Sequence, residues 1–214
     1  MKNNTWIKVV ITIVILELVV GGAIFAYKKL NVKDSNNISV KDKKVVNLYN
    51  KIAYFDIDSL DVMNPESMLY YGYKNIKNKE SINCDVVEVS DNTEGYECEG
   101  IVDFVKSDTI ENKVKDIYGP NIIIEKTSFE VDPNHYAFYD SINDGFVLYT
   151  KKEEEKVNPV NLKLKQATYD DKKNILLTVD VLDGVFGDVL NTYKFTFEKA
   201  SKNYYLIKKE KVTS

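Results

Sequence analysis

Arginine is absent from this sequence of 214 residues, so every basic residue that carries a fixed charge is one of 29 lysines. Its absence excludes bidentate guanidinium contacts to phosphate, carboxylate or guanine. The sequence also has a single histidine, His135, and two cysteines, Cys84 and Cys98. A zinc site built on several histidines is therefore excluded, as is an H-E-x-x-H metalloprotease helix. We expect no metal site and no cofactor.

The common catalytic motifs are missing as well. No G-x-S-x-G, G-x-x-x-x-G-K or G-x-G-x-x-G segment occurs. His135 lies at an expected turn, which favours an exposed or locally bonded side chain over a general base. Residues 140–145 resemble the start of a calcium loop, but Ile142 and Lys151 stand where oxygen ligands are needed, so we predict a plain hairpin turn. We therefore predict no catalytic residue. The alternative is a pair of catalytic carboxylates of the glycosidase type, because the 33 acidic residues allow many such pairs.

One long apolar run is present, from Val9 to Tyr27, and Glu17 is its single charged residue. Nineteen helical residues at ~1.5 Å each span ~28 Å, close to the hydrocarbon thickness of a bilayer. The run predicts a membrane-spanning helix within a signal anchor at residues 1–29. A cleaved signal peptide is the alternative. A charged Glu17 is costly in lipid, so it is either a protonated, tolerated residue or a contact to a partner helix.

The charge is divided unevenly along the chain. The first thirty residues carry four lysines and one glutamate, a net charge of +3. The whole chain has a net charge of −4, so the remaining 184 residues have a net charge of −7. An acidic domain without arginine is a poor candidate for binding nucleic acid. Lysines on both sides of the span would by counting alone keep the large domain in the cytoplasm. The signal-like start and the cysteines instead favour a single-pass protein of the cell membrane with an extracytoplasmic domain.

The two cysteines predict a disulfide. Cys84 and Cys98 are equidistant from residue 91, inside a turn-like segment at 90–95 with alternating apolar residues on both sides. This pattern predicts a hairpin in which the cysteines face each other and close a loop of ~15 residues. Two reduced, buried thiols are the alternative. A redox pair is disfavoured because the spacing is not C-x-x-C.

Helical signals dominate the first part of the domain. A polar tether at residues 30–44 leads into an amphipathic helix over about 40–54. Asn64 and Pro65 mark the start of a second helix. Ser107 is expected to cap a third helix over 108–118, which Gly119 and Pro120 would end.

Beyond Pro120 the apolar period changes to alternation, which is typical of strands. The expected strands are 122–126, 136–139, 146–150, 160–169, 174–182, 192–198 and 204–211. We therefore expect one α+β domain over 45–214, helical at 45–119 and an antiparallel sheet at 120–214, with two to three helices packed on a β-meander. This pattern is similar to cystatin-like and nuclear-transport-factor-like folds.

Tyrosines are the candidate contact residues. Tyr70, Tyr71 and Tyr73 cluster early, and Tyr204 and Tyr205 lie in the last strand. Tyrosine combines apolar area with a polar tip, which suits a ligand or partner surface. A structural role in the core or on a half-buried sheet is the alternative.

A family resemblance rests on three segments that follow the anchor and the tether. They are FVKSDTIENKVKDIYGPNIIIEKTSF, YAFYDSINDGFVLYT and YKFTFEKASKNYYLIKKEKV. The chain resembles uncharacterised single-pass membrane-anchored extracytoplasmic proteins of AT-rich, low-GC Firmicutes and their mollicute relatives, over roughly residues 100–214. The resemblance implies no catalytic residues and no assigned activity.

Together these features predict a non-catalytic, membrane-anchored domain that binds a protein partner or ligand at the cell envelope. The alternatives are a cell-wall hydrolase that uses paired carboxylates and a structural subunit of a membrane complex in which Glu17 contacts a partner helix. An enzyme is the less favoured class. The membrane is the expected partner of residues 9–27.

Overall fold

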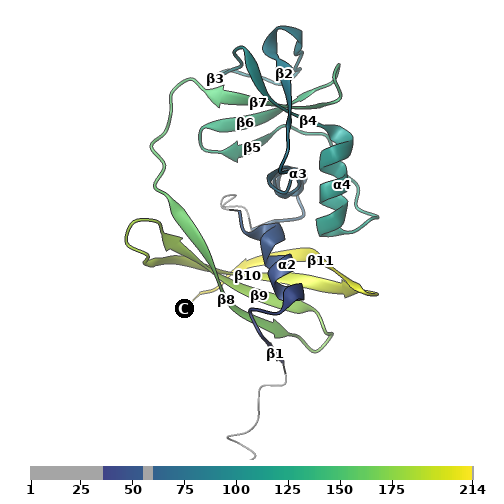
Figure 1. The fold of residues 1–214 in the computed structure, drawn as a ribbon, viewed down its shortest axis with the longest axis vertical. Helices are drawn as coiled ribbons and strands as arrows, with labels where there is room; N and C mark the ends of the chain where they lie inside the picture. Colours follow the sequence, from purple (N-terminus) through teal and green to yellow (C-terminus); the bar gives the residue numbers. More distant parts are fainter. Residues whose placement is uncertain (1–35, 55–59, 214) are drawn as a thin grey trace, which may run out of the picture. The chain divides into compact units, whose positions relative to one another are not determined.

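A computed structural model describes residues 36–54 and 60–213 of the chain, which has an α+β fold (Figure 1). Two units are distinguished, Met1–Asn37 and Ile38–Ser214, and the second contains the domain described below. The predicted membrane-spanning segment at 9–27 lies outside the described residues. Within the described ranges, no helix combines the length and apolar character needed to cross a bilayer.

In the described residues, three α-helices begin and end largely where local signals predict. They are α2 (Lys43–Ile52), α3 (Pro65–Lys74) and α4 (Ser107–Tyr118). The Asn64 side chain accepts a hydrogen bond from the amide of Ser67 at 2.7 Å, which confirms the predicted start of α3. Gly119, at a φ of 106°, ends α4 as expected. Ser107 was expected as the cap of α4, but it is the first helical residue, so that prediction was wrong.

One antiparallel sheet is the predicted meander. Its order is β1-β8-β9-β10-β11. Its strands are β1 (Asn37–Ile38), β8 (Val160–Tyr169), β9 (Ile175–Asp183), β10 (Val189–Ala200) and β11 (Asn203–Lys211). Buried apolar side chains recur at every second position in β9 (Ile175, Leu177, Val179, Val181) and in β10 (Tyr193, Phe195, Phe197), and this period explains why the strands were predictable.

A second antiparallel sheet, drawn separately in Figure 1, was not predicted. Its order is β2-β4-β7-β6-β5, with β3 added on β7. Its strands are β2 (Glu80–Asn83), β3 (Tyr96–Glu97), β4 (Ile101–Lys106), β5 (Phe129–Asp132), β6 (His135–Asp140) and β7 (Gly145–Lys151). The expectation of one sheet over 120–214 was wrong because β5 to β7 form a separate sheet, in which β7 pairs with β3 and β4 from the first part of the chain. Residues 122–126, expected as a strand, form none.

The helices and both sheets share one hydrophobic core. Val45, Leu48 and Ile52 of α2 are buried in it, as their spacing predicts. α3 and α4 pack closely at Gly72, where an added Cβ would lie 2.7 Å from a methyl group of Val114. A smaller cluster of buried side chains lies within the second sheet.

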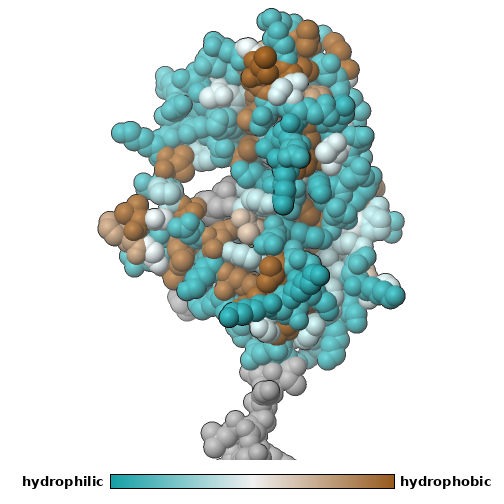
Figure 2. Space-filling model, in the orientation of Figure 1, coloured by the Kyte–Doolittle hydropathy of each residue, from teal (hydrophilic) through white to brown (hydrophobic). Residues whose placement is uncertain are grey.

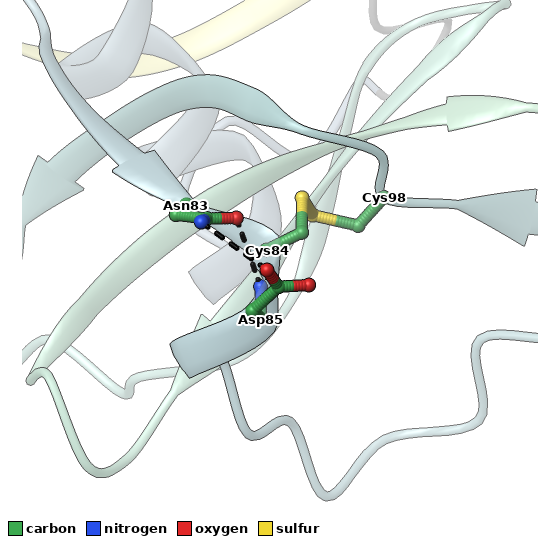
Figure 3. The surroundings of a disulfide bond; sticks show 4 residues. All are labelled: Asn83, Cys84, Asp85 and Cys98. Atoms are coloured by element: carbon green, nitrogen blue, oxygen red, sulfur yellow. Dashed lines mark hydrogen bonds between the residues drawn. A yellow bond between two sulfur atoms is a disulfide. The ribbon is translucent and has the colours of Figure 1, made fainter.

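Cys84 and Cys98 form a disulfide with Cα atoms 5.7 Å apart (Figure 3). The predicted hairpin between them was wrong. A short 3-10 helix, η1 (Cys84–Val86), begins at the first cysteine, and β3 beside the second pairs with β7. Pairing of β2 with β4 brings the cysteines together, since the amide of Cys84 donates to the carbonyl of Gly100 at 2.9 Å. The disulfide therefore closes the loop 85–97 at the end of this pair.

Candidate functional site

A groove of about 780 Å³ lies between α2, the end of α4 and the turn from β10 to β11. We call it the lysine groove because five lysines of the described residues line it: Lys43, Lys44, Lys51, Lys115 and Lys202. Three separate parts of the chain contribute these side chains. Figure 2 shows apolar atoms protruding at the left, at the turn between β9 and β10, whereas hydrophilic and apolar side chains are mixed around α2.

The positive charges of the groove are only partly compensated. In the described part of the chain, the carboxylates that line it are Asp42 and Asp116. Asp42 is engaged at the start of α2, where its side chain accepts from the amide of Lys44 at 2.8 Å. Among the residues the structure describes, Lys43, Lys44 and Lys202 have no carboxylate within ion-pair distance. The groove therefore concentrates positive charge on a domain whose net charge is negative.

Lys115 and Lys51 are more constrained. Lys115 forms an ion pair with Glu111 one turn earlier in α4, at 3.5 Å. The half-buried Lys51 donates a hydrogen bond to the main-chain carbonyl of Asp116. Burial lowers the pKa of Lys51, and the charge of Asp116 partly opposes this effect. These two lysines hold the groove wall, whereas the other three form no ion pair with a described residue.

Two of the predicted contact residues line the groove. Tyr204 is 8% exposed, and the ammonium of Lys44 lies 5.2 Å from the centre of its ring. Burial raises the pKa of Tyr204. The hydroxyl of the half-buried Tyr205 accepts a hydrogen bond from the side-chain amide of Asn203 at 3.2 Å. The groove thus combines lysine ammonium groups with an apolar, tyrosine-lined wall.

The other predicted contact residues lie elsewhere. Tyr70, Tyr71 and Tyr73 of α3 are each no more than 3% exposed and belong to the core. The ring of Tyr73 meets that of Phe129 edge-on, with centroids 5.7 Å apart. For these three tyrosines the alternative interpretation, a structural role in the core, agrees with the structure. Glu17 lies outside the described residues.

Two residues considered for chemistry have local roles. The Nδ1 atom of His135 lies 2.8 Å from Oδ1 of Asp132, so the histidine is locally bonded as predicted. Asp140 is fully buried and accepts hydrogen bonds from the amides of Ile142 and Asn143, which confirms a plain turn. Within the described ranges, no group of three or more acidic, histidine or cysteine side chains is suited to a metal ion.

Sequence reasoning did not find the groove lysines. They lie on segments up to 159 positions apart, from Lys43 to Lys202, and lysine is frequent throughout the chain. The polar stripe of Lys44, Asn47 and Lys51 on α2 was the available signal, but such a stripe is also typical of a solvated helix face. Three-dimensional packing of α2 beside the ends of α4 and β11 was needed to bring the charges together.

No protein-family model, curated protein or solved structure matches this chain. Function is therefore inferred from the geometry and charge of the groove.

Proposed function

We propose that this chain is a non-catalytic, membrane-anchored extracytoplasmic protein whose lysine groove binds an anionic ligand or partner segment at the cell envelope. The observation that carries the proposal is the gathering of Lys43, Lys44 and Lys202, all without a carboxylate partner in the described part of the chain, around the wall formed by Tyr204 and Tyr205. A phosphate or carboxylate group would supply the missing negative charge.

Several properties of the groove favour binding over chemistry. Its lysines are ammonium point charges that suit phosphate or carboxylate groups. Each of its two carboxylates interacts with another group of the protein. Asp42 accepts a hydrogen bond at the start of α2, and the charge of Asp116 acts on Lys51. Among its described lining residues, none forms a nucleophile and base pair. We therefore assign it to recognition of an anion, with phosphate-rich and carboxylate-rich polymers as the chemical classes.

The anchor at residues 9–27, the extracytoplasmic location and the resemblance to single-pass proteins of low-GC Firmicutes are parts of the same proposal. The tether expected over residues 30–44 is part of it only before β1, since β1 and the start of α2 belong to the domain. The disulfide of Cys84 and Cys98 supports the proposal, because disulfides persist in oxidising compartments outside the cytoplasm. The finer comparison with cystatin-like or nuclear-transport-factor-like folds also stays a prediction.

Site-specific cross-linking of the intact protein in its own membrane tests this function. A photoreactive aromatic residue replaces Tyr205 at the groove, and a matched variant carries it in place of exposed Lys163 of β8. We expect an adduct with a phosphate- or carboxylate-bearing envelope component from position 205 but not from position 163. The adduct should weaken when Lys43 and Lys44 are changed to glutamine.

Equal adducts from positions 205 and 163, or none above an anchor-only control, would contradict the proposal. An adduct whose yield is unchanged by Lys43→Gln and Lys44→Gln would also contradict it, since the lysines would then have no part in recognition.

A further inference from the structure

A second pocket, of about 420 Å³, lies in the sheet that carries the disulfide. We call it the aromatic pocket. Among the side chains that line it are Glu66, Asp91, Tyr96, Ser128, Tyr136 and Phe138. No lysine of the described ranges lines this pocket, in contrast to the groove. The two hollows therefore differ in the sign of charge that they present.

Three aromatic rings in the pocket contact one another. The centroids of Tyr136 and Phe138 are 4.8 Å apart, those of Tyr96 and Tyr136 are 5.4 Å apart, and those of Tyr96 and Phe138 are 5.7 Å apart. Phe138 is buried, whereas both tyrosines are half-buried and line the open part. Aromatic faces carry partial negative charge, and grouped rings are suited to hold a cation.

Carboxylates add negative charge at the same place. Glu66, in the first turn of α3, is exposed and forms no ion pair with a lysine of the described ranges. Burial raises the pKa of Tyr136, and the charges of Glu66 and Asp91 raise it further. Lys151 lies opposite Tyr96 in the β3 and β7 ladder, but it forms an ion pair with Glu155. The charged side chains that line the pocket are therefore carboxylates.

The disulfide-closed loop 85–97 builds one wall of the pocket by supplying Asp91 and Tyr96. Contacts along the loop hold it in place. The hydroxyl of Ser128 donates to the carboxylate of Asp91, and the carbonyl of Gly95 accepts from the amide of Lys152 at 2.9 Å. Farther from the pocket, Val89 forms an isolated antiparallel β-bridge with Asp140. The loop is thus fixed at its two ends by the disulfide and at several points between them.

We propose that the aromatic pocket binds a cationic ammonium group, quaternary or primary, through the rings of Tyr96 and Tyr136 and the carboxylate of Glu66. The ring cluster favours an organic cation over a metal ion, because ammonium groups bind aromatic faces without the oxygen cage that a divalent metal requires. The disulfide acts as a positioning element, since it holds the loop that carries Asp91 and Tyr96.

Tetramethylammonium is a suitable probe, with uncharged tert-butanol as the control of similar size. NMR of the intact chain in detergent micelles, with ¹³C-labelled tyrosine rings, would report on Tyr96 and Tyr136 individually. We expect saturable shifts at these two rings with tetramethylammonium alone. Glu66→Gln should weaken binding about three- to ten-fold. The control is Glu198→Gln, which makes the same charge change at an exposed position of β10 and should leave binding unchanged.

Two further variants separate the ring from its hydroxyl and from folding. Tyr136→Phe keeps the ring and should retain binding, whereas Tyr136→Leu should abolish it. Reduction of the disulfide should weaken binding while the shifts of Tyr204 in the lysine groove stay unchanged. Unsaturable shifts, equal shifts with tert-butanol, or full binding by a folded Tyr136→Leu protein would each overturn the proposal.

Discussion

The ammonium group of Lys51 in α2 donates a hydrogen bond to the main-chain carbonyl of Asp116 in the last turn of α4. A carbonyl at this point of a helix ordinarily accepts from the amide four residues later, but that residue is Pro120, which has no N–H. Lys51 supplies the missing donor from another helix. The bond joins two walls of the lysine groove and gives a structural reason for a half-buried lysine.

Replacing Lys51 with methionine should therefore lower stability. The methionine keeps much of the apolar stem but leaves the Asp116 carbonyl without its donor, which costs about 1 kcal/mol of the free energy of unfolding. Urea denaturation measures the change. Lys43→Met on the exposed face of the same helix is the control and should change stability by less than half as much. Equal effects of the two substitutions would show that the hydrogen bond contributes nothing.

Gly72→Ala tests the close packing of α3 on α4. The new methyl group would lie 2.7 Å from Cγ2 of Val114 and 3.1 Å from Cγ1 of Ile110, closer than van der Waals contact allows. We expect a loss of about 1–3 kcal/mol despite the better helix propensity of alanine. Thermal unfolding compares this variant with Asn112→Ala on the exposed side of α4. An unchanged or higher melting temperature for Gly72→Ala would contradict the packing described above.

The disulfide should stabilise the domain by constraining the unfolded chain. A closed loop of ~15 residues is worth about 3 kcal/mol, so Cys84→Ser with Cys98→Ser should lower the free energy of unfolding by about that amount. Reducing agent should destabilise the parent protein similarly and leave the double variant unaffected. If reductant changed neither protein, the cysteines would not be bonded in solution.

Local signals predicted much of this fold. The start of α3 at Asn64 and Pro65, the end of α4 at Gly119 and the strands β8 to β11 all follow from side chains close in sequence. The division into two sheets did not, because the pairing of β4 with β7 joins segments about 40 residues apart and depends on tertiary packing. The cysteines show both cases, since their bond was predicted but the strand pair that aligns them was not.

The candidate site was less accessible to prediction. Tyr204 and Tyr205 were expected contact residues and line the groove, but Tyr70, Tyr71 and Tyr73 are buried. Clustering of tyrosines in sequence does not distinguish these environments, because a helix turns successive side chains toward different neighbours and α3 is enclosed on most sides. Charge alone was equally uninformative, since lysines are distributed over the whole chain.

Asp144 predicts a specific acid sensitivity. Hydrogen bonds from Lys126 at 2.6 Å and from the hydroxyl of Tyr139 at 2.9 Å lower its pKa from 3.8 to about 2. Since the folded pKa is the lower one, the stabilisation is complete above about pH 4 and is lost as the pH falls toward 2. Asp144→Asn should make stability vary less over this interval. The stabilisation itself is small, even where it is complete, because the carboxylate is exposed.

The positive φ of Asp144, 47°, makes asparagine the appropriate replacement, since it tolerates this conformation in the turn between β6 and β7. Urea midpoints between about pH 2 and pH 5 measure the difference. Parallel curves for the parent protein and Asp144→Asn would show that this carboxylate is not a source of the acid sensitivity.

The affinity of the intact chain for inorganic polyphosphate, measured calorimetrically in detergent at low salt, tests the central claim most directly. Lys43→Gln, Lys44→Gln and Lys202→Gln combined remove three charges from the groove, and the same change at exposed Lys152, Lys156 and Lys163 is the matched control. The proposed function predicts at least about ten-fold weaker binding for the groove variant and less than about a two-fold change for the control. Equal losses in both variants, or no binding by the parent protein, would contradict the assignment of the lysine groove as an anion-binding site.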